Sequence, residues 1–286
     1  NGLFRLRLED SGPVLTRFAG FPVLESLSVR SLVKDSKNSI WITTSGEGVF
    51  RMTFREDAYI PVSVQHLDMN SGLAGNNVLA LFEDTGENIW MGFNGEGLSL
   101  LTSDAFEFFA PGGISGQNNI IFIGRLSGNY LLGTPSGFYL YDLSAVKPVS
   151  FTSLTGKTGQ KAVNSYFIDK EENIWVGTQG SGLYVKRKTG VIRQFYRSGD
   201  SGSDYISNIA ADDENIWLAT LNGVRIISRK TGALKEVYDI NNGLPPKGIN
   251  HILMLGDGSS YVATESDRLY RIIPGSGVVA SDVAMH

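Results

Sequence analysis

The segment ENIWVGTQGSGL, at residues 172–183, decides the fold because nearly the same segment occurs earlier, as ENIWMGFNGEGL at residues 87–98. Eight of the twelve positions are identical in the two copies. Weaker copies stand elsewhere, such as NSIWITTSGEGVF at residues 38–50 and ENIWLATLNGVRI at residues 214–226. A catalytic residue has no reason to recur in this way, so we interpret the segment as a building unit.

The position of the Trp in this segment sets the period of the repeat. Two copies carry another residue there, and the six positions are Trp41, Trp90, Leu131, Trp175, Trp217 and Tyr261. The steps between them are 49, 41, 44, 42 and 44 residues. A period of about 40 to 50 residues, in units made of short strands, is typical of propeller blades with four strands each. The sequence therefore predicts an all-β fold, a β-propeller of four-stranded blades.

Each unit contains the signals that four strands require. A strand-like run precedes a polar turn and the Ile-Trp pair, a Gly-containing loop follows, and two further strand-like runs such as GLYVKRK and GVIRQFY complete the unit. The chain has 34 Gly among 286 residues, above the usual ~7%, which indicates many tight turns. No stretch shows a sustained 3.6-residue apolar period, so we expect no long helix.

The number of blades depends on how the two ends of the chain fit the unit. Residues 1–20 match the last two strands of a blade, and six further units span residues 21–62, 63–110, 111–153, 154–197, 198–240 and 241–286. A first hairpin of about 20 residues is all that a seventh blade lacks. We predict a single domain, a seven-bladed propeller with one incomplete blade, with a six-bladed propeller as the alternative.

The repeated residues have structural explanations. A large ring at a fixed place in each blade fills the space between neighbouring sheets, where it buries about 150–250 Å². The Gly two residues later, such as Gly177, lets a neighbouring element approach closely. The Asp that precedes the turn between the first two strands is expected to cap this turn with its carboxylate. These residues are Asp35, Asp84, Asp169 and Asp212.

Composition excludes several classes of function. The net charge of −4 and the lack of a long basic stripe argue against nucleic acid as a partner. The chain has no Cys, which excludes disulfides and thiolate chemistry. It has no run of about 18 apolar residues, so we expect no direct membrane insertion. We also predict no cofactor and no metal site.

Functional residues are expected where the copies differ. In a propeller, the loop between the second and third strands of a blade lies on the same face as the loop that leads into the next blade. These loops are rich in amide and hydroxyl side chains, which suit a hydroxyl-rich ligand, although Asn also favours turns for structural reasons alone. The candidate ligand-binding residues are Asn76, Asn77, Asn94, Glu96, Asn118, Asn119, Gln179, Asn222, His251 and Glu265.

Catalytic motifs are scarce. The chain has three His residues, His66, His251 and His286, which are too few and too scattered for a metal site of three or four ligands. His251 is the one candidate for a general base, and a lone His is more often a structural group. We therefore predict no catalytic residue and no enzymatic activity in this region.

The full unit, GLAGNNVLALFEDTGENIWMGFNGEGL at residues 72–98, resembles the two-component regulator propeller repeat. The first part of this unit, which precedes the polar turn, recurs in DINNGLPPKGINHI at residues 239–252. The resemblance covers essentially the whole chain. The third and sixth units depart from the pattern because they lack the Trp. The resemblance implies a bacterial, periplasmic sensor region of an inner-membrane receptor, in which two propellers, a small β-sandwich and a membrane helix precede a histidine kinase.

This resemblance also implies what the region binds. Relatives detect oligosaccharides, so it implies a small-molecule or oligosaccharide ligand and a homodimer formed through a neighbouring domain. Any kinase activity would then lie outside this chain. One alternative is a scaffold for protein–protein interaction or dimerisation without a small ligand. A less favoured alternative is a propeller lyase similar to the streptogramin lyases, which would depend on His251.

Overall fold

The computed structural model describes residues 2–9, 12–18, 21–55, 60–102, 106–109, 119–142, 147–154, 157–158, 161–264 and 268–284. The chain divides into two compact units. The first unit consists of residues 1–6 and 16–152, and the second unit of residues 7–15 and 153–286.

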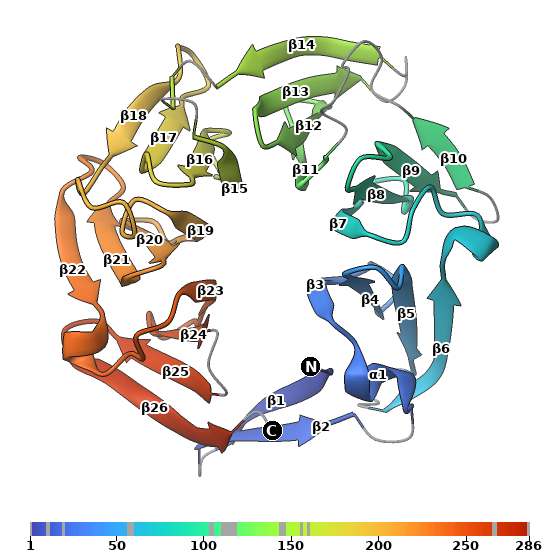
Figure 1. Cartoon of the computed structure of the whole chain (residues 1–286), viewed down its shortest axis with the longest axis horizontal. Helices are drawn as coiled ribbons and strands as arrows, with labels where there is room; N and C mark the ends of the chain where they lie inside the picture. Colours follow the sequence, from blue (N-terminus) through green and yellow to red (C-terminus); the bar gives the residue numbers. More distant parts are fainter. Residues whose placement is uncertain are drawn as a thin grey trace. The chain divides into compact units, whose positions relative to one another are not determined.

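Six four-stranded sheets, each called a blade here, account for most of both units, and the strands of each blade pair in chain order (Figure 1). The first unit contains blades β3 (Val29–Lys34), β4 (Ser39–Thr44), β5 (Val49–Phe54), β6 (Pro61–Leu67); β7 (Val78–Glu83), β8 (Ile89–Phe93), β9 (Leu98–Leu101), β10 (Phe106–Phe109); and β11 (Phe122–Leu126), β12 (Asn129–Thr134), β13 (Gly137–Asp142), β14 (Lys147–Ser153).

The second unit repeats this arrangement (Figure 1). Its blades are β15 (Val163–Ile168), β16 (Ile174–Thr178), β17 (Leu183–Lys186), β18 (Arg193–Tyr196); β19 (Ile206–Ala211), β20 (Asn215–Thr220), β21 (Gly223–Ser228), β22 (Leu234–Tyr238); and β23 (Ile249–Met254), β24 (Ser260–Thr264), β25 (Arg268–Ile273), β26 (Gly277–Ala284). Within the described ranges, helical structure is limited to α1 (Val23–Ser26) and the 3-10 turns η1 (Met69–Ser71) and η2 (Ile240–Asn242).

These sheets confirm the predicted all-β propeller of four-stranded blades. The described strands form six blades, which is the number of the alternative interpretation and not the seven of the main one. The reason lies in the leading hairpin. Strands β1 (Phe4–Glu9) and β2 (Gly12–Arg17) form a separate two-stranded sheet, and no other described strand is hydrogen-bonded to it.

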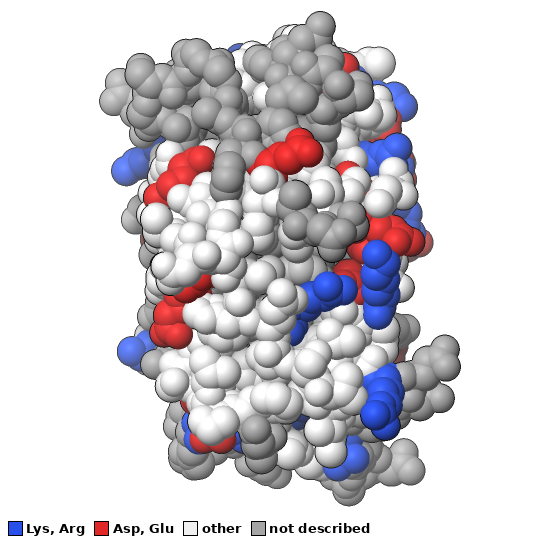
Figure 2. Space-filling model, turned by 90° about the vertical axis from the view of Figure 1, so that its right-hand side faces the viewer, with Lys and Arg blue, Asp and Glu red and all other residues white. Residues whose placement is uncertain are grey.

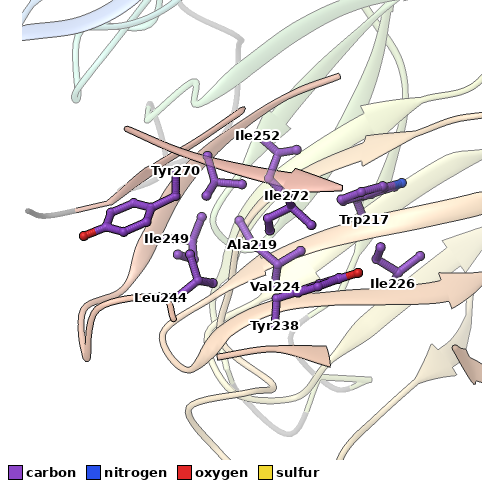
Figure 3. Close-up of a cluster of buried hydrophobic side chains, with 11 residues drawn as sticks. Trp217, Ala219, Val224, Ile226, Tyr238, Leu244, Ile249, Ile252, Tyr270 and Ile272 are labelled. Atoms are coloured by element: carbon purple, nitrogen blue, oxygen red, sulfur yellow. The ribbon is translucent and has the colours of Figure 1, made fainter. Parts of the chain in front are cut away.

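The repeated Trp residues are buried between successive blades, as predicted. Trp217, on β20, is 1% exposed and packs with Ile252 and Ile272 of the following blade in one apolar cluster (Figure 3). Trp175, which is fully buried, packs in the same way against Ile209 of the blade that follows its own. Burial of such rings stabilises the contacts between neighbouring blades within each unit.

The Gly two residues after the Trp provides the predicted clearance. A Cβ atom on Gly177 would lie 2.3 Å from Ser165 Oγ and 2.7 Å from Ile206 Cγ2, so no side chain fits there. A Cβ on Gly92 would lie 2.8 Å from Ile120. Ser165 belongs to the same blade as Gly177, whereas Ile206 begins and Ile120 precedes the first strand of the next blade, so these Gly residues allow close packing both within and between blades.

The Asp residues cap their turns as expected and make a further bond that the sequence did not predict. Asp169 Oδ1 accepts hydrogen bonds from the backbone N–H of Asn173 at 2.8 Å and of Glu171 at 3.1 Å. Its second oxygen accepts the indole N–H of Trp175 at 2.8 Å. The same Asp–Trp bond joins Asp35 to Trp41, Asp84 to Trp90 and Asp212 to Trp217.

The surface carries both signs of charge. Figure 2 shows one side of the molecule, on which acidic and basic side chains are interspersed among uncharged ones. Within the ranges given above, no helix has the length and apolar character to cross a bilayer.

Candidate functional site

Loops between the second and third strands of a blade contact the segment that enters the next blade. Isolated β-bridges pair Ser45 with Asn77, Asn94 with Asn119, and Gln179 with Tyr205. Four of the predicted site residues are therefore part of these bridges. The loop face predicted from the sequence is built in this way within each unit.

In the first unit, Asn76 and Asn77 are engaged by the protein itself. Asn76 Oδ1 accepts the backbone N–H of Met69 at 2.9 Å, and its carbonyl oxygen accepts that of Gly48 at 2.8 Å. The carbonyl of Asn77 accepts the N–H of Asn94 at 3.1 Å, while its buried Oδ1 has no hydrogen-bond partner among the residues that the structure describes. Asn76 thus stabilises the loop that leads into β7.

The other predicted residues of the first unit lie close to this bridge. Asn94 and Glu96 are exposed, and Asn119 is half-buried. The carboxylate of Glu96 lies over Gly75, where an added Cβ would come within 2.9 Å of Glu96 Cδ. Asn118 lies outside the described residues. The structure therefore brings Asn77, Asn94 and Asn119 together along one bridged edge.

In the second unit, Gln179 and Asn222 are both exposed on loops between second and third strands. Asn222 is oriented by its neighbours, since its Nδ2 donates to Asp200 Oδ2 at 2.7 Å. Hydrogen bonds from the Ser203 side chain, the Ser203 backbone and Asn222 lower the pKa of Asp200, so this carboxylate is ionised and fixed in place.

His251, on β23, stands apart from these loops, and Glu265 lies outside the described residues. The imidazole is exposed by surface area, yet the protein around it desolvates the ring enough to lower the pKa of His251.

A cavity of about 310 Å³ lies on the predicted face, between the loop from β20 to β21 and the segment that leads into β23. Its lining includes one predicted residue, Asn222. The full lining is Leu221, Asn222, Gly223, Asp239, Ile240, Pro245, Pro246 and Lys247. Sequence reasoning missed the other residues because the two contributing segments are distant in the chain.

A larger hollow of about 550 Å³ lies at the opposite end of the neighbouring blades, lined by Glu171, Asn173, Arg187, Asp213, Glu214, Ser228, Arg229, Lys230 and Lys235. Two ion pairs form within this lining, between Arg229 and Glu171 and between Lys235 and Glu214 at 3.9 Å. Arg229 also contacts Asp169 at 3.0 Å. This hollow is a junction of ion pairs between two blades. In the part of the chain that the structure describes, no group of three or more His, Asp or Glu could hold a metal ion.

Comparison with known proteins places this architecture among solved propellers. No family model matches the chain, and no curated protein matches it. A solved extracellular domain of the hybrid two-component system BT4673 from B. thetaiotaomicron is similar, with a TM-score of 0.75 and 15% identity over 97% of this chain and 41% of that one. The corresponding domain of BT3049 has a TM-score of 0.53 and 16% identity over 98% of this chain and 44% of that one.

Enzymes share the fold as well. Virginiamycin B lyase from Staphylococcus aureus matches with a TM-score of 0.72 and 11% identity, over 90% of this chain and 85% of the lyase. This chain spans less than half of the two sensor domains, at 41% and 44% of their lengths. At such low identities the likeness establishes the fold, and the chain is a β-propeller of the architecture found in extracellular sensor domains and in lyases.

Proposed function

We propose that this chain is a ligand-binding sensor region of an extracytoplasmic, two-component type receptor, and that its ligand is an oligosaccharide or another glycan-derived molecule. The observation that carries the proposal is the 310 Å³ cavity on the loop face, which combines apolar walls with a few polar groups. Pockets for small ligands have this composition and begin at about 300 Å³. The shared architecture with the BT4673 domain supports the sensor role.

A periplasmic location and a homodimer formed through a neighbouring domain belong to the same proposal. Both follow from the repeat resemblance, and the solved sensor domains are extracellular parts of two-component systems. In this arrangement the signal would be passed to a kinase outside the present chain.

The sensor proposal does not require catalysis, and the surroundings of His251 support this. A catalytic imidazole is normally oriented by a hydrogen bond at its second nitrogen. Among the described residues, no hydrogen bond to the His251 ring is found, and the ring therefore has no positioning partner of this kind. We propose that the region is non-catalytic, in contrast to the lyases that share its fold.

A thermal-shift screen of the chain against neutral and acidic oligosaccharides tests the proposal. A ligand that binds only the folded state raises the melting temperature by mass action, by an amount that grows with its concentration. We expect at least one saccharide to raise the Tm in this manner. A flat response over a broad saccharide panel would contradict the proposal and favour the scaffold alternative.

The lyase alternative has its own test. Incubation of the chain with a streptogramin B antibiotic, followed by mass spectrometry, should leave the antibiotic intact. Turnover that is lost on the substitution His251→Ala would instead assign a lyase activity to this residue.

A further inference from the structure

We propose that the cavity beside η2 holds one terminal ring of an uncharged saccharide and discriminates against acidic saccharides. This inference rests on the proposed function and adds the position and the chemical class of the ligand. It is argued from the walls, the rigidity and the polar groups of the cavity, all of which belong to the second unit.

The walls are apolar and uncovered. Leu221 is 45% exposed and Ile240 is 60% exposed, and Pro245 and Pro246 complete the lining. Apolar surface of this kind gains free energy when a ligand removes it from water. The C–H face of a sugar ring is a suitable partner, because it is apolar while the hydroxyl groups at its rim remain free.

Hydrogen bonds and turn geometry constrain the backbone beside the cavity. Asp239 caps η2 through a capping box, in which Asn241 N–H donates to Asp239 Oδ1 at 2.8 Å and Asp239 N–H donates to Asn242 Oδ1 at 3.2 Å. The turn ends at Gly243, whose φ of 100° few other residues adopt. The two Pro residues restrict the backbone that follows. A preformed site loses less conformational entropy on binding, which favours small ligands.

The polar groups suit hydroxyls. Asn222 donates its amide hydrogen to Asp200, and its Oδ1 makes no hydrogen bond within the described part of the chain, so this oxygen can accept a hydroxyl hydrogen. Lys247 is exposed and forms no ion pair among the described residues, so its ammonium can donate to a hydroxyl or ring oxygen. A hydroxyl both donates and accepts, and it can satisfy groups of either kind.

The charges of the lining cancel. Lys247 and Asp239 are its two charged residues, one of each sign. A uronate carboxylate would gain the attraction of Lys247 but would also meet the carboxylate of Asp239, and like charges that face each other are costly. The geometry therefore points to a ring without a charged group.

Calorimetric titration of the intact chain tests this inference with named probes. Neutral disaccharides of glucose, xylose, mannose and galactose are compared with digalacturonate. We expect one or more neutral disaccharides to bind, and digalacturonate to bind about tenfold more weakly than the best of them. Binding of digalacturonate as tight as that of the neutral probes would overturn the inference.

A pair of matched variants locates the site. Met69 occupies the equivalent position of η1 and is also 60% exposed, but it does not line this cavity. We expect Ile240→Ser to weaken disaccharide binding about fivefold and Met69→Ser to leave it unchanged, with the same melting temperature for both. Equal effects of the two substitutions would show that the saccharide binds elsewhere.

A charge substitution tests selectivity. Asn also caps helical turns well, so Asp239→Asn keeps the capping function while it leaves Lys247 as the one charge of the lining. We expect digalacturonate to gain affinity relative to neutral disaccharides in this variant, and not in the control Asp68→Asn at η1. Absence of this gain would contradict the charge argument. Failure of every saccharide to bind would overturn the proposed function itself. Saccharide binding that is unchanged by the substitutions of Ile240 and Asp239 would overturn only the assignment of the ligand to this cavity.

Discussion

Asp169 Oδ2 lies 2.8 Å from the indole Nε1 of Trp175, and both side chains are buried. One carboxylate therefore serves two purposes, because it caps the turn between β15 and β16 and also fixes the ring that packs against the next blade. A third contact, from Arg229 of that next blade at 3.0 Å, balances its charge.

Removal of this carboxylate should destabilise the fold strongly. In Asp169→Ala, the turn N–H groups and the buried indole N–H lose their acceptor, and a buried donor without a partner costs about 1–3 kcal/mol. We expect a loss of about 3 kcal/mol in the free energy of unfolding, measured by urea denaturation. Asp212→Ala is the comparison, because Asp212 is less buried and lies 3.3 Å from Trp217 Nε1. A loss at Asp212 as large as that at Asp169 would contradict this ranking.

Gly177 should tolerate no side chain. In Gly177→Ala the new Cβ would meet Ser165 Oγ of the same blade at 2.3 Å and Ile206 Cγ2 of the next blade at 2.7 Å, so the strand pair and the contact between the two blades would both have to shift. Overpacking of this kind costs about 1–3 kcal/mol. Gly256→Ala is the control, since nothing lies within 4 Å of a Cβ there. We expect the control to unfold within about 0.5 kcal/mol of the wild type, as is usual for surface positions. Similar unfolding curves for the two variants would count against close packing at Gly177.

Stability should fall at acidic pH because of the turn carboxylates. Burial acts to raise the pKa of Asp84, but hydrogen bonds from Trp90, Asn88 and Gly86 outweigh it, and the pKa is lowered below the ordinary value of 3.8. A lowered pKa in the folded state gives stability that is present above pH 3.8 and lost as the pH falls through the folded pKa. Asp212 is shifted in the same direction.

Urea unfolding between about pH 6 and about pH 3 measures this effect. The free energy of unfolding should decrease toward the acid end, and the decrease should be smaller in Asp84→Asn, which has no proton to gain at this position. A variant with the full acid dependence of the wild type would show that Asp84 does not contribute.

At alkaline pH, ionisation of Tyr238 should lower the stability of the fold. Burial, followed by its hydrogen bond to Glu236 and the charge of that carboxylate, raises the pKa of Tyr238 from 10.0 to about 12. The resulting stability is fully present below pH 10.0 and is lost as the pH rises toward 12. Burial raises the pKa of several other Tyr residues as well, and ultraviolet titration should show a step near pH 12 that disappears in Tyr238→Phe while the other late steps remain. The same late step in the variant would assign it to another Tyr.

Asn76 provides a test between a structural and a ligand-binding role. Its side chain accepts the N–H of Met69 at 2.9 Å, so Asn76→Ala should cost about 1 kcal/mol and speed hydrogen exchange at the Met69 amide. If saccharide binding is lost in this variant while that exchange rate is unchanged, the residue acts on the ligand directly.

The structural roles of the repeated residues could be predicted from the sequence. Trp175, Gly177 and Asp169 recur with the same spacing in several units, and their burial, clearance and turn-capping roles are all present in the structure. The bond between Asp169 and the indole was missed, because a turn-capping role already explained the Asp and nothing in the spacing showed which way its second oxygen points.

The cavity and the blade count could not be predicted in the same way. Asn222 was identified from its loop, but Pro245 and Lys247 reach the same cavity from a segment more than twenty positions further along the chain. Their meeting depends on how one blade is stacked on the next. The blade count depends on which strands pair at the ends of the chain, and local patterns of side chains do not determine such long-range pairing.

The packing of each Trp into the following blade has a consequence for folding cooperativity. Trp41 clusters with Leu81 of the next blade, and Trp217 with Ile252 of its own successor, so a blade on its own would expose the ring that it contributes. Stability then depends on nearest-neighbour couplings, as in a linear array of repeats. Within each unit, blades are therefore expected to melt together. Duplication of one repeat supplies both the Trp and the surface that receives it, so a new contact between blades arises in a single genetic step.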